Sequence, residues 1–234
     1  LFLENVFPYM DNYNYQKGMK AIIQELKNFL KRKDIGTDSD RALLLDFQAT
    51  LEIKPEKAIK LEKDALAQIE NITADNARLV SNLHANLGGL YRMNGHPDLA
   101  REHMEKSISL LDQFNLLHIN DSIPQIANYA MFLTEQQEPE RGISELQKLS
   151  GIIKEYHSDE CLDYAKVQET LATIYLMTAN LSHAKTHFKK AFKIYEKIWA
   201  DEPEMIEAKY QEIQELYPQI GFCIGKNLSG LLTK

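Results

Sequence analysis

The sequence predicts an all-α protein, an α–α superhelix of about five helix pairs followed by C-terminal capping helices. Two observations support this class. Glycine and proline are scarce, with 10 and 7 among 234 residues, while the helix-forming residues Leu, Ala, Glu and Lys are abundant. The sequence also resembles itself at a fixed spacing of about 42 residues, and a spacing of this size is typical of stacked repeats.

The repeat is carried by side-chain size more than by residue identity. Small residues recur at Gly88, Ala130 and Ala172, and again at Ala58, Ala100, Gly142 and Ala184. Large apolar residues recur at Leu87, Tyr129 and Leu171, and at Met104, Leu146 and Phe188. Two helices approach closely only where one offers a small side chain and its neighbour fills the space. The pattern therefore predicts helix hairpins that pack at these positions.

Start and stop signals place each element in turn. Gly36 interrupts the chain, Thr37 or Asp38 caps the next helix, and Pro55 starts its partner. The later turns contain similar polar residues, glycines and prolines. The predicted pairs span about residues 1–33, 38–70, 74–115, 122–157 and 159–199, and the capping helices span 202–217 and 219–232. Because the sequence shows no linker, we expect a single domain over residues 1–234.

The segment from Asn86 through Gly88 and Tyr91 to Ala100, together with the later Ala184, Phe188 and Ala191, resembles the tetratricopeptide repeat. The basic unit of that family has about 34 residues, and the longer period of this sequence, about 42 residues, is similar to the kinesin-light-chain-like version of the repeat. The resemblance covers residues 39–199 best, and it implies a right-handed solenoid whose first helices line a concave face.

The resemblance also implies which side chains face the groove and bind a peptide or protein segment. The expected binding residues are Asn82, Asn86, Arg92, Met93, Asn128, Met131, Lys166, Thr170 and Met177. An Asn amide both donates and accepts, so it can pair with a peptide main chain, and Met adapts to varied surfaces. A second interpretation is that Asn86 and Asn128 bridge neighbouring helices.

Some chaperone-binding relatives hold a C-terminal carboxylate with five Lys, Asn and Arg side chains. Here Asn128 and Lys166 match two of those positions, whereas Ala85, Gly89 and Thr170 occupy the others. This array is incomplete, and we do not expect recognition of an acidic C-terminal tail.

The leading functional hypothesis is a non-catalytic scaffold for proteins or peptides. The alternative is a ligand- or peptide-sensing regulatory domain of a larger bacterial transcription regulator or signalling ATPase, whose effector domain would lie upstream. The chain begins with Leu1 rather than Met, from which we expect a fragment of a longer protein.

We expect no catalytic residues, no cofactor and no metal site. The segment from Gly221 to Lys226 departs from a phosphate loop in its spacing, and no predicted strand precedes it. His183 and His187 lie one helical turn apart, but no third ligand follows in the pattern. Cys161 has no nucleophile signature around it, and a helix cap explains its polar neighbours better.

Charge and hydropathy bear on partners and location. The net charge of −7 argues against nucleic-acid binding by this fragment. No apolar stretch is long enough to span a membrane, and two cysteines suit a reducing compartment, so we expect a cytoplasmic protein. An apolar stripe of Ile224, Leu228 and Leu231 suggests a homodimer through the end helices.

Two consecutive predicted helices carry opposite charge. The first contains Lys185, Lys189, Lys190, Lys193 and Lys197, and the second contains Asp201, Glu202, Glu204, Glu207, Glu212 and Glu215. The expectation is that these two helices neutralise each other, with little energy from each exposed pair.

Overall fold

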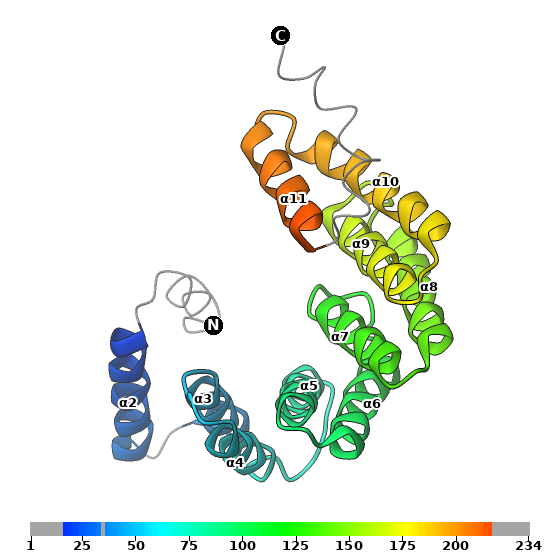
Figure 1. The fold of residues 1–234 in the computed structure, drawn as a ribbon. Coiled ribbons are helices and arrows are strands. Elements are labelled where there is room, and N and C mark those ends of the chain that lie inside the picture. Colours follow the sequence, from blue (N-terminus) through cyan, green and yellow to red (C-terminus); the bar gives the residue numbers. More distant parts are fainter. Residues whose placement is uncertain (1–15, 34–35, 217–234) are drawn as a thin grey trace. The chain divides into compact units, whose positions relative to one another are not determined.

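The computed structural model describes residues 16–33 and 36–216, and it confirms the all-α class. These residues form ten helices and no strand. The chain divides into two compact units, Leu1–Leu116 and Leu117–Lys234. Figure 1 labels their helices. The expected single domain over residues 1–234 stays a prediction.

The first unit contains five described helices. They are α2 (Gln16–Lys33), α3 (Asp38–Thr50), α4 (Pro55–Leu66), α5 (Ala77–Met93) and α6 (Pro97–Gln113). Helix α3 packs on α2 and α4, and α5 packs on α3, α4 and α6. One core cluster joins α2 to α3 through Met19, Ile23 and Phe47, and another joins α3, α4 and α5 through Ala42, Ala65 and Leu83. The partner expected for α2 lies outside the described residues.

The second unit also contains five described helices. They are α7 (Ser122–Glu135), α8 (Pro139–Tyr156), α9 (Leu162–Met177), α10 (Leu181–Ile198) and α11 (Pro203–Leu216). Helix α9 contacts α7, α8 and α10, and α10 contacts α11. Helix α11 buries Ile206, Tyr210 and Ile213, as expected of the first capping helix. The second capping helix, expected at 219–232, and the apolar stripe within it lie outside the described residues.

The second helices of the pairs confirm the period. They begin at Pro55, Pro97, Pro139 and Leu181, which are evenly spaced along the chain at the interval that the sequence predicts. Proline suits the first position of a helix because its fixed φ is helical and it lacks an N–H that would have no partner there. The prolines therefore mark the starts that the sequence predicts.

The first helices start less regularly, because different caps set their starts. Helix α5 starts at Ala77 instead of near residue 74, because the Thr73 N–H donates to Asn76 Oδ1 at 2.8 Å and closes a turn. Helix α9 starts at Leu162 instead of near 159, because Cys161 is its N-cap and accepts from the Tyr164 N–H at 3.4 Å.

The small positions of the repeat are sites of close packing. A Cβ atom added at Gly88 would lie 2.5 Å from Met104 Cγ, and one added at Gly142 would lie 2.6 Å from the Ala130 carbonyl oxygen. Both distances are too short for a real contact, so each hairpin packs more closely than alanine would allow. The contact of Gly88 with Met104 is the predicted packing of a small residue against a large one, whereas at Gly142 two small positions, Gly142 and Ala130, meet.

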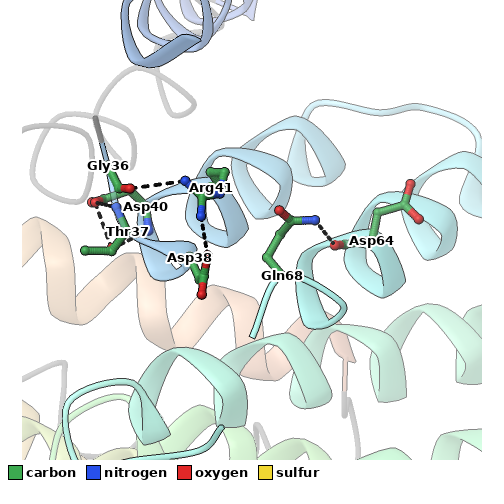
Figure 2. Close-up of polar contacts among 7 residues, drawn as sticks. All are labelled: Gly36, Thr37, Asp38, Asp40, Arg41, Asp64 and Gln68. Atoms are coloured by element: carbon green, nitrogen blue, oxygen red, sulfur yellow. Dashed lines mark hydrogen bonds and ion pairs between the residues drawn. The ribbon is translucent and has the colours of Figure 1, made fainter. Parts of the chain in front are cut away.

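Helix α3 begins with a reciprocal capping box, shown in Figure 2. The Asp40 N–H donates to Thr37 Oγ1 at 3.1 Å, and the Thr37 N–H donates to Asp40 Oδ2 at 2.7 Å. The hydrogen bond from the Thr37 N–H and, to a smaller extent, one from the Thr37 hydroxyl to Asp40 Oδ2 at 2.8 Å lower the pKa of the Asp40 carboxyl. The cap satisfies amide groups that a helix start otherwise leaves without partners, so α3 begins at a defined residue.

Candidate functional site

Five of the nine predicted binding residues lie on α7 and α9, two first helices that contact each other in the second unit. They are Asn128 and Met131 on α7, and Lys166, Thr170 and Met177 on α9. These helices bury their other faces through residues such as Ile126 and Phe132 on α7, and Val167 and Leu171 on α9. The burial pattern therefore fixes which side chains remain accessible.

The five side chains differ in their exposure to solvent and in their polar contacts. Asn128 is exposed, and no side chain in the described part of the chain is hydrogen-bonded to its amide. Lys166 is also exposed, with its ammonium 3.8 Å from Asp163 Oδ1. Thr170 donates its hydroxyl to the Lys166 carbonyl at 3.0 Å. Met131 is half-buried and Met177 is exposed. Of these five residues, the exposed polar side chains are therefore Asn128 and Lys166.

The other four predicted residues, Asn82, Asn86, Arg92 and Met93, lie on α5 in the first unit. Met93 is exposed, whereas Asn82 and Arg92 are half-buried. Asn86 remains accessible, but its amide is bound within the protein: Nδ2 donates to Asp46 Oδ1 at 2.9 Å and to Glu62 Oε1 at 3.2 Å. Asn86 thus bridges α3, α4 and α5, and this supports the second interpretation of that residue.

The partners of Asn86 form a carboxyl pair that the sequence analysis does not single out. Glu62 is only 2% exposed, and burial, together with the adjacent Asp46, raises its pKa to about 10. Burial also raises the pKa of Asp46. At neutral pH the Glu62 carboxyl is therefore protonated and hydrogen-bonded to Asp46, while its Oε2 has no partner in the described part of the protein.

The repeat itself carries the signal for this carboxyl pair. One period after Asp46 and Glu62 the chain has Gly88 and Met104, the small and large residues that pack together in the next hairpin. An acidic residue at each of two core positions predicts a polar contact inside the hairpin, since buried polar groups need hydrogen bonds.

Two aromatic and histidine clusters occur at equivalent repeat positions. In the α5–α6 hairpin, the Nδ1 atoms of His84 and His103 lie 2.8 Å apart, and the His103 ring stacks on Tyr91. Two periods later, in the α9–α10 hairpin, Tyr175 replaces Tyr91, His187 replaces His103 and Gln168 replaces His84.

The second cluster keeps the same contacts as the first. His187 Nδ1 lies 2.9 Å from Gln168 Oε1, and both His187 and His183 stack on Tyr175. His183 Nδ1 also lies 2.9 Å from Asn180 Oδ1. These contacts account for both histidines. Within residues 16–33 and 36–216 no group of three or more His, Cys, Asp or Glu side chains is placed to hold a metal ion.

The expected pairing of the basic and acidic helices does not hold for the described residues. Among them no ion pair joins a lysine of α10 to an acidic residue of α11. Lys197 pairs instead with Glu160 in the turn before α9, and Glu212 of α11 pairs with Lys209 of its own helix at 2.9 Å. The two charged faces therefore remain largely available to solvent.

Helix α11 is held by a different polar group. The Tyr195 hydroxyl of α10 donates to Glu169 Oε2 at 2.6 Å, and Lys209 Nζ lies 2.8 Å from Glu169 Oε1. Burial and the adjacent Glu169 raise the pKa of the Tyr195 hydroxyl. The Tyr210 ring stacks on Phe192 with centroids 4.1 Å apart. One buried contact set thus joins α9, α10 and α11.

A cavity of about 210 Å³ lies between α2, α3 and α4 in the first unit. Its lining residues are Lys20, Ile23, Gln24, Gln48, Leu51, Glu52 and Leu61. This lining contains neither a cysteine or serine nucleophile nor a histidine base. None of the helices in the described ranges is long and apolar enough to cross a membrane.

Comparisons with known proteins agree with this geometry. The tetratricopeptide repeat family model matches residues 122–197, from the start of α7 to the end of α10. No curated protein matches the sequence. Among solved structures, BtubC (BKLC) from P. vanneervenii is similar, with a TM-score of 0.70 and 17% identity over 88% of this chain and 83% of that chain.

Two further structures share the fold at low identity. A putative kinesin light chain of Podosopora anserina, with nearly identical TPR-like repeats, has a TM-score of 0.63 and 14% identity, covering 84% of this chain and 96% of that chain. MamA has a TM-score of 0.53 and 15% identity, covering 80% of this chain and 94% of that chain. The family match thus covers residues 122–197, and the observed repeat period and these neighbours show a helical-repeat fold like that of tetratricopeptide-repeat and kinesin-light-chain-like proteins.

Proposed function

We propose that this protein is a non-catalytic interaction scaffold. It binds an extended segment of a protein or peptide on the exposed surface of α7 and α9 in its second unit. Tetratricopeptide-repeat folds generally serve as protein-interaction scaffolds. Since a fold alone does not establish a function, the proposal depends on the side chains of that face.

The observation that carries the proposal is the contrast between two asparagines at the same repeat position. Asn86 donates to two carboxyl groups inside the first unit. Asn128, one period later, is exposed on α7, and no described side chain is hydrogen-bonded to it. An amide that offers both a donor and an acceptor to solvent can pair with the main chain of a bound segment.

The neighbouring side chains suit the same kind of ligand. Lys166, on the adjacent helix α9, provides an exposed cation for a carboxylate or carbonyl of the ligand. Met131 and Met177 provide flexible apolar surface, which adapts to different ligand side chains. The proposed ligand is therefore an extended segment with a mixed polar and apolar sequence, held mainly through its main chain.

We further propose that the protein is not an enzyme and lies in the cytoplasm. The repeat positions are explained by packing, and the histidines of α5, α6 and α10 are engaged in stacking and hydrogen bonds. Two cysteines in 234 residues suit a reducing compartment, and we place the protein in the cytoplasm.

The experiment selects ligands from a displayed library of random peptides with the immobilised protein and measures the affinity of the selected peptides. Replacing the two accessible polar groups, Asn128→Ala with Lys166→Ala, is expected to weaken binding about tenfold or more, because it removes two polar contacts. The melting temperature should stay within about 2 °C of the wild type, since both side chains are exposed.

The matched control replaces one exposed asparagine and one exposed lysine of the first unit, Asn71→Ala with Lys57→Ala. This variant should bind the selected peptides like the wild type. Selected peptides that bind both variants equally well would contradict the proposal, and so would a library that yields no binder.

A further inference from the structure

Five lysines form one face of α10, which we call the lysine ridge: Lys185, Lys189, Lys190, Lys193 and Lys197. Because successive residues of an α-helix are rotated by about 100°, the five side chains fall within an arc of about 140°. Four of them are exposed and Lys185 is half-buried. The ridge is therefore a continuous basic surface, separate from the predicted binding residues on α7 and α9.

Little in the described part of the chain compensates this charge. The acidic residue of α10 itself, Glu196, accepts a hydrogen bond from the Tyr210 hydroxyl at 3.2 Å. In the described ranges, Lys197 is the one member of the ridge that forms an ion pair. Like charges four residues apart destabilise a helix, so the fold carries this charge at a cost.

Glu160 shows that the ridge binds a carboxylate group. This exposed residue, in the turn before α9, forms a hydrogen-bonded ion pair with Lys197. The hydrogen bond from Lys197 and, to a smaller extent, the charge of Lys193 lower the pKa of the Glu160 carboxyl. One end of the ridge thus already holds a carboxylate, and its remaining length offers the same environment.

We propose that the lysine ridge is a second binding surface, which takes an acidic segment of a partner protein in an extended conformation. Lysines four residues apart on a helix are about 6 Å apart along its axis. In an extended segment, side chains on one face recur about every 6.6 Å. Acidic residues at alternate positions of such a segment can therefore reach Lys185, Lys189, Lys193 and Lys197 in order.

An acidic protein segment fits the surroundings better than a nucleic acid does. The chain has a net charge of −7, and Glu204, Glu207 and Glu215 are on α11, the helix that packs on α10. A phosphate backbone would extend past a ridge about 18 Å long into this acidic region and be repelled. A short acidic segment is confined to the ridge itself.

The test measures binding of a fluorescein-labelled peptide of eight residues, with Ser and Glu alternating, by anisotropy at low ionic strength. A peptide with Ser and Gln alternating is the uncharged control. We expect the acidic peptide to bind, the control peptide not to bind, and the affinity to fall as salt is added. Lys189→Gln with Lys193→Gln should weaken binding about tenfold.

The charge-matched control variant is Lys57→Gln with Lys60→Gln on α4, which should leave binding unchanged. The ridge variant should melt at the same temperature as the wild type or slightly higher, because it removes like-charge repulsion; its loss of binding then does not reflect unfolding. Asn128→Ala with Lys166→Ala should also keep its affinity for the acidic peptide, so the two surfaces are tested separately.

Three outcomes would overturn the proposal. They are no binding of the acidic peptide, equal loss in the ridge and control variants, and tighter binding of an oligothymidylate of similar charge than of the peptide. Self-association of the wild type in sedimentation experiments that the ridge variant abolishes would assign the surface to a second copy of the chain instead.

Discussion

The turns inside three hairpins place one residue each in the left-handed region of φ, at the same repeat position. Gly95, Gln137 and Ala179 have φ of 76°, 65° and 58°, and each lies one repeat period after the one before. Glycine adopts this conformation without a steric cost, whereas other residues pay about 1 kcal/mol or more for it. The repeat geometry is therefore imposed on Gln137 and Ala179 by the packing of their hairpins.

Replacing Gln137 or Ala179 by glycine should stabilise the protein. We expect each single variant to raise the free energy of unfolding by about 0.5 kcal/mol, because relief of the left-handed strain exceeds the extra entropy that glycine gives the unfolded chain. Chemical denaturation measures this change. A matched variant at Gly151, Gly151→Ala inside α8, should also stabilise, and destabilisation by Gln137→Gly would contradict the assigned turn geometry.

At the scale of elements, the histidine clusters make two hairpins sensitive to acid. Burial lowers the pKa of His84 to about 4, with smaller contributions from His103 and Lys106. Burial, aided by Lys190 and His183, likewise lowers the pKa of His187 to about 4. A histidine that must stay neutral in the folded hairpin takes up a proton more readily when the chain unfolds.

The contribution of these histidines to the free energy of unfolding should therefore fall as the pH is lowered from about 6.5 to about 4. In this window the two histidines bind more protons in the unfolded chain than in the folded chain, so their contribution rises with pH, and below about 4 it is fully lost. The almost fully buried His84 should contribute about 1–3 kcal/mol.

The variant His84→Gln provides the control, because glutamine is the residue that faces the histidine in the α9–α10 hairpin. Its unfolding should depend less on pH in the same window, as measured by urea denaturation at pH 7, 5 and 4. An unchanged pH dependence would contradict the role assigned to His84.

At the scale of the whole molecule, the helix pairs can be predicted from the residues that start and stop helices and from the regular recurrence of small and large side chains. Pro55 begins a helix as predicted, Pro97 and Pro139 begin the corresponding helices of the next pairs, and Gly88 and Gly142 lie at close contacts because the hairpins need small residues there. Such features repeat along the chain, and each can be recognised by comparison with its counterparts.

The side-chain partners were harder to predict than the helices. The bonds from Asn86 to Asp46 and Glu62 join three helices, and an amide motif alone does not reveal whether it faces protein or ligand. Likewise, charge composition predicted that α10 and α11 would pair, but the turn before α9 brings Glu160 to Lys197. Partners of this kind depend on the three-dimensional packing of residues that are far apart in the sequence.

We propose that the same repeat position is structural in the first unit, at Asn86, and binds ligand in the second, at Asn128. The most direct test compares Asn86→Ala with Asn128→Ala by urea denaturation and by affinity for a selected peptide. We predict that Asn86→Ala loses about 1–3 kcal/mol of stability, because it removes the amide that donates hydrogen bonds to the buried carboxyl pair. This variant should keep its affinity for the peptide. Asn128→Ala should keep its stability and bind about fivefold to tenfold more weakly; equal effects of the two variants on both quantities would contradict the claim.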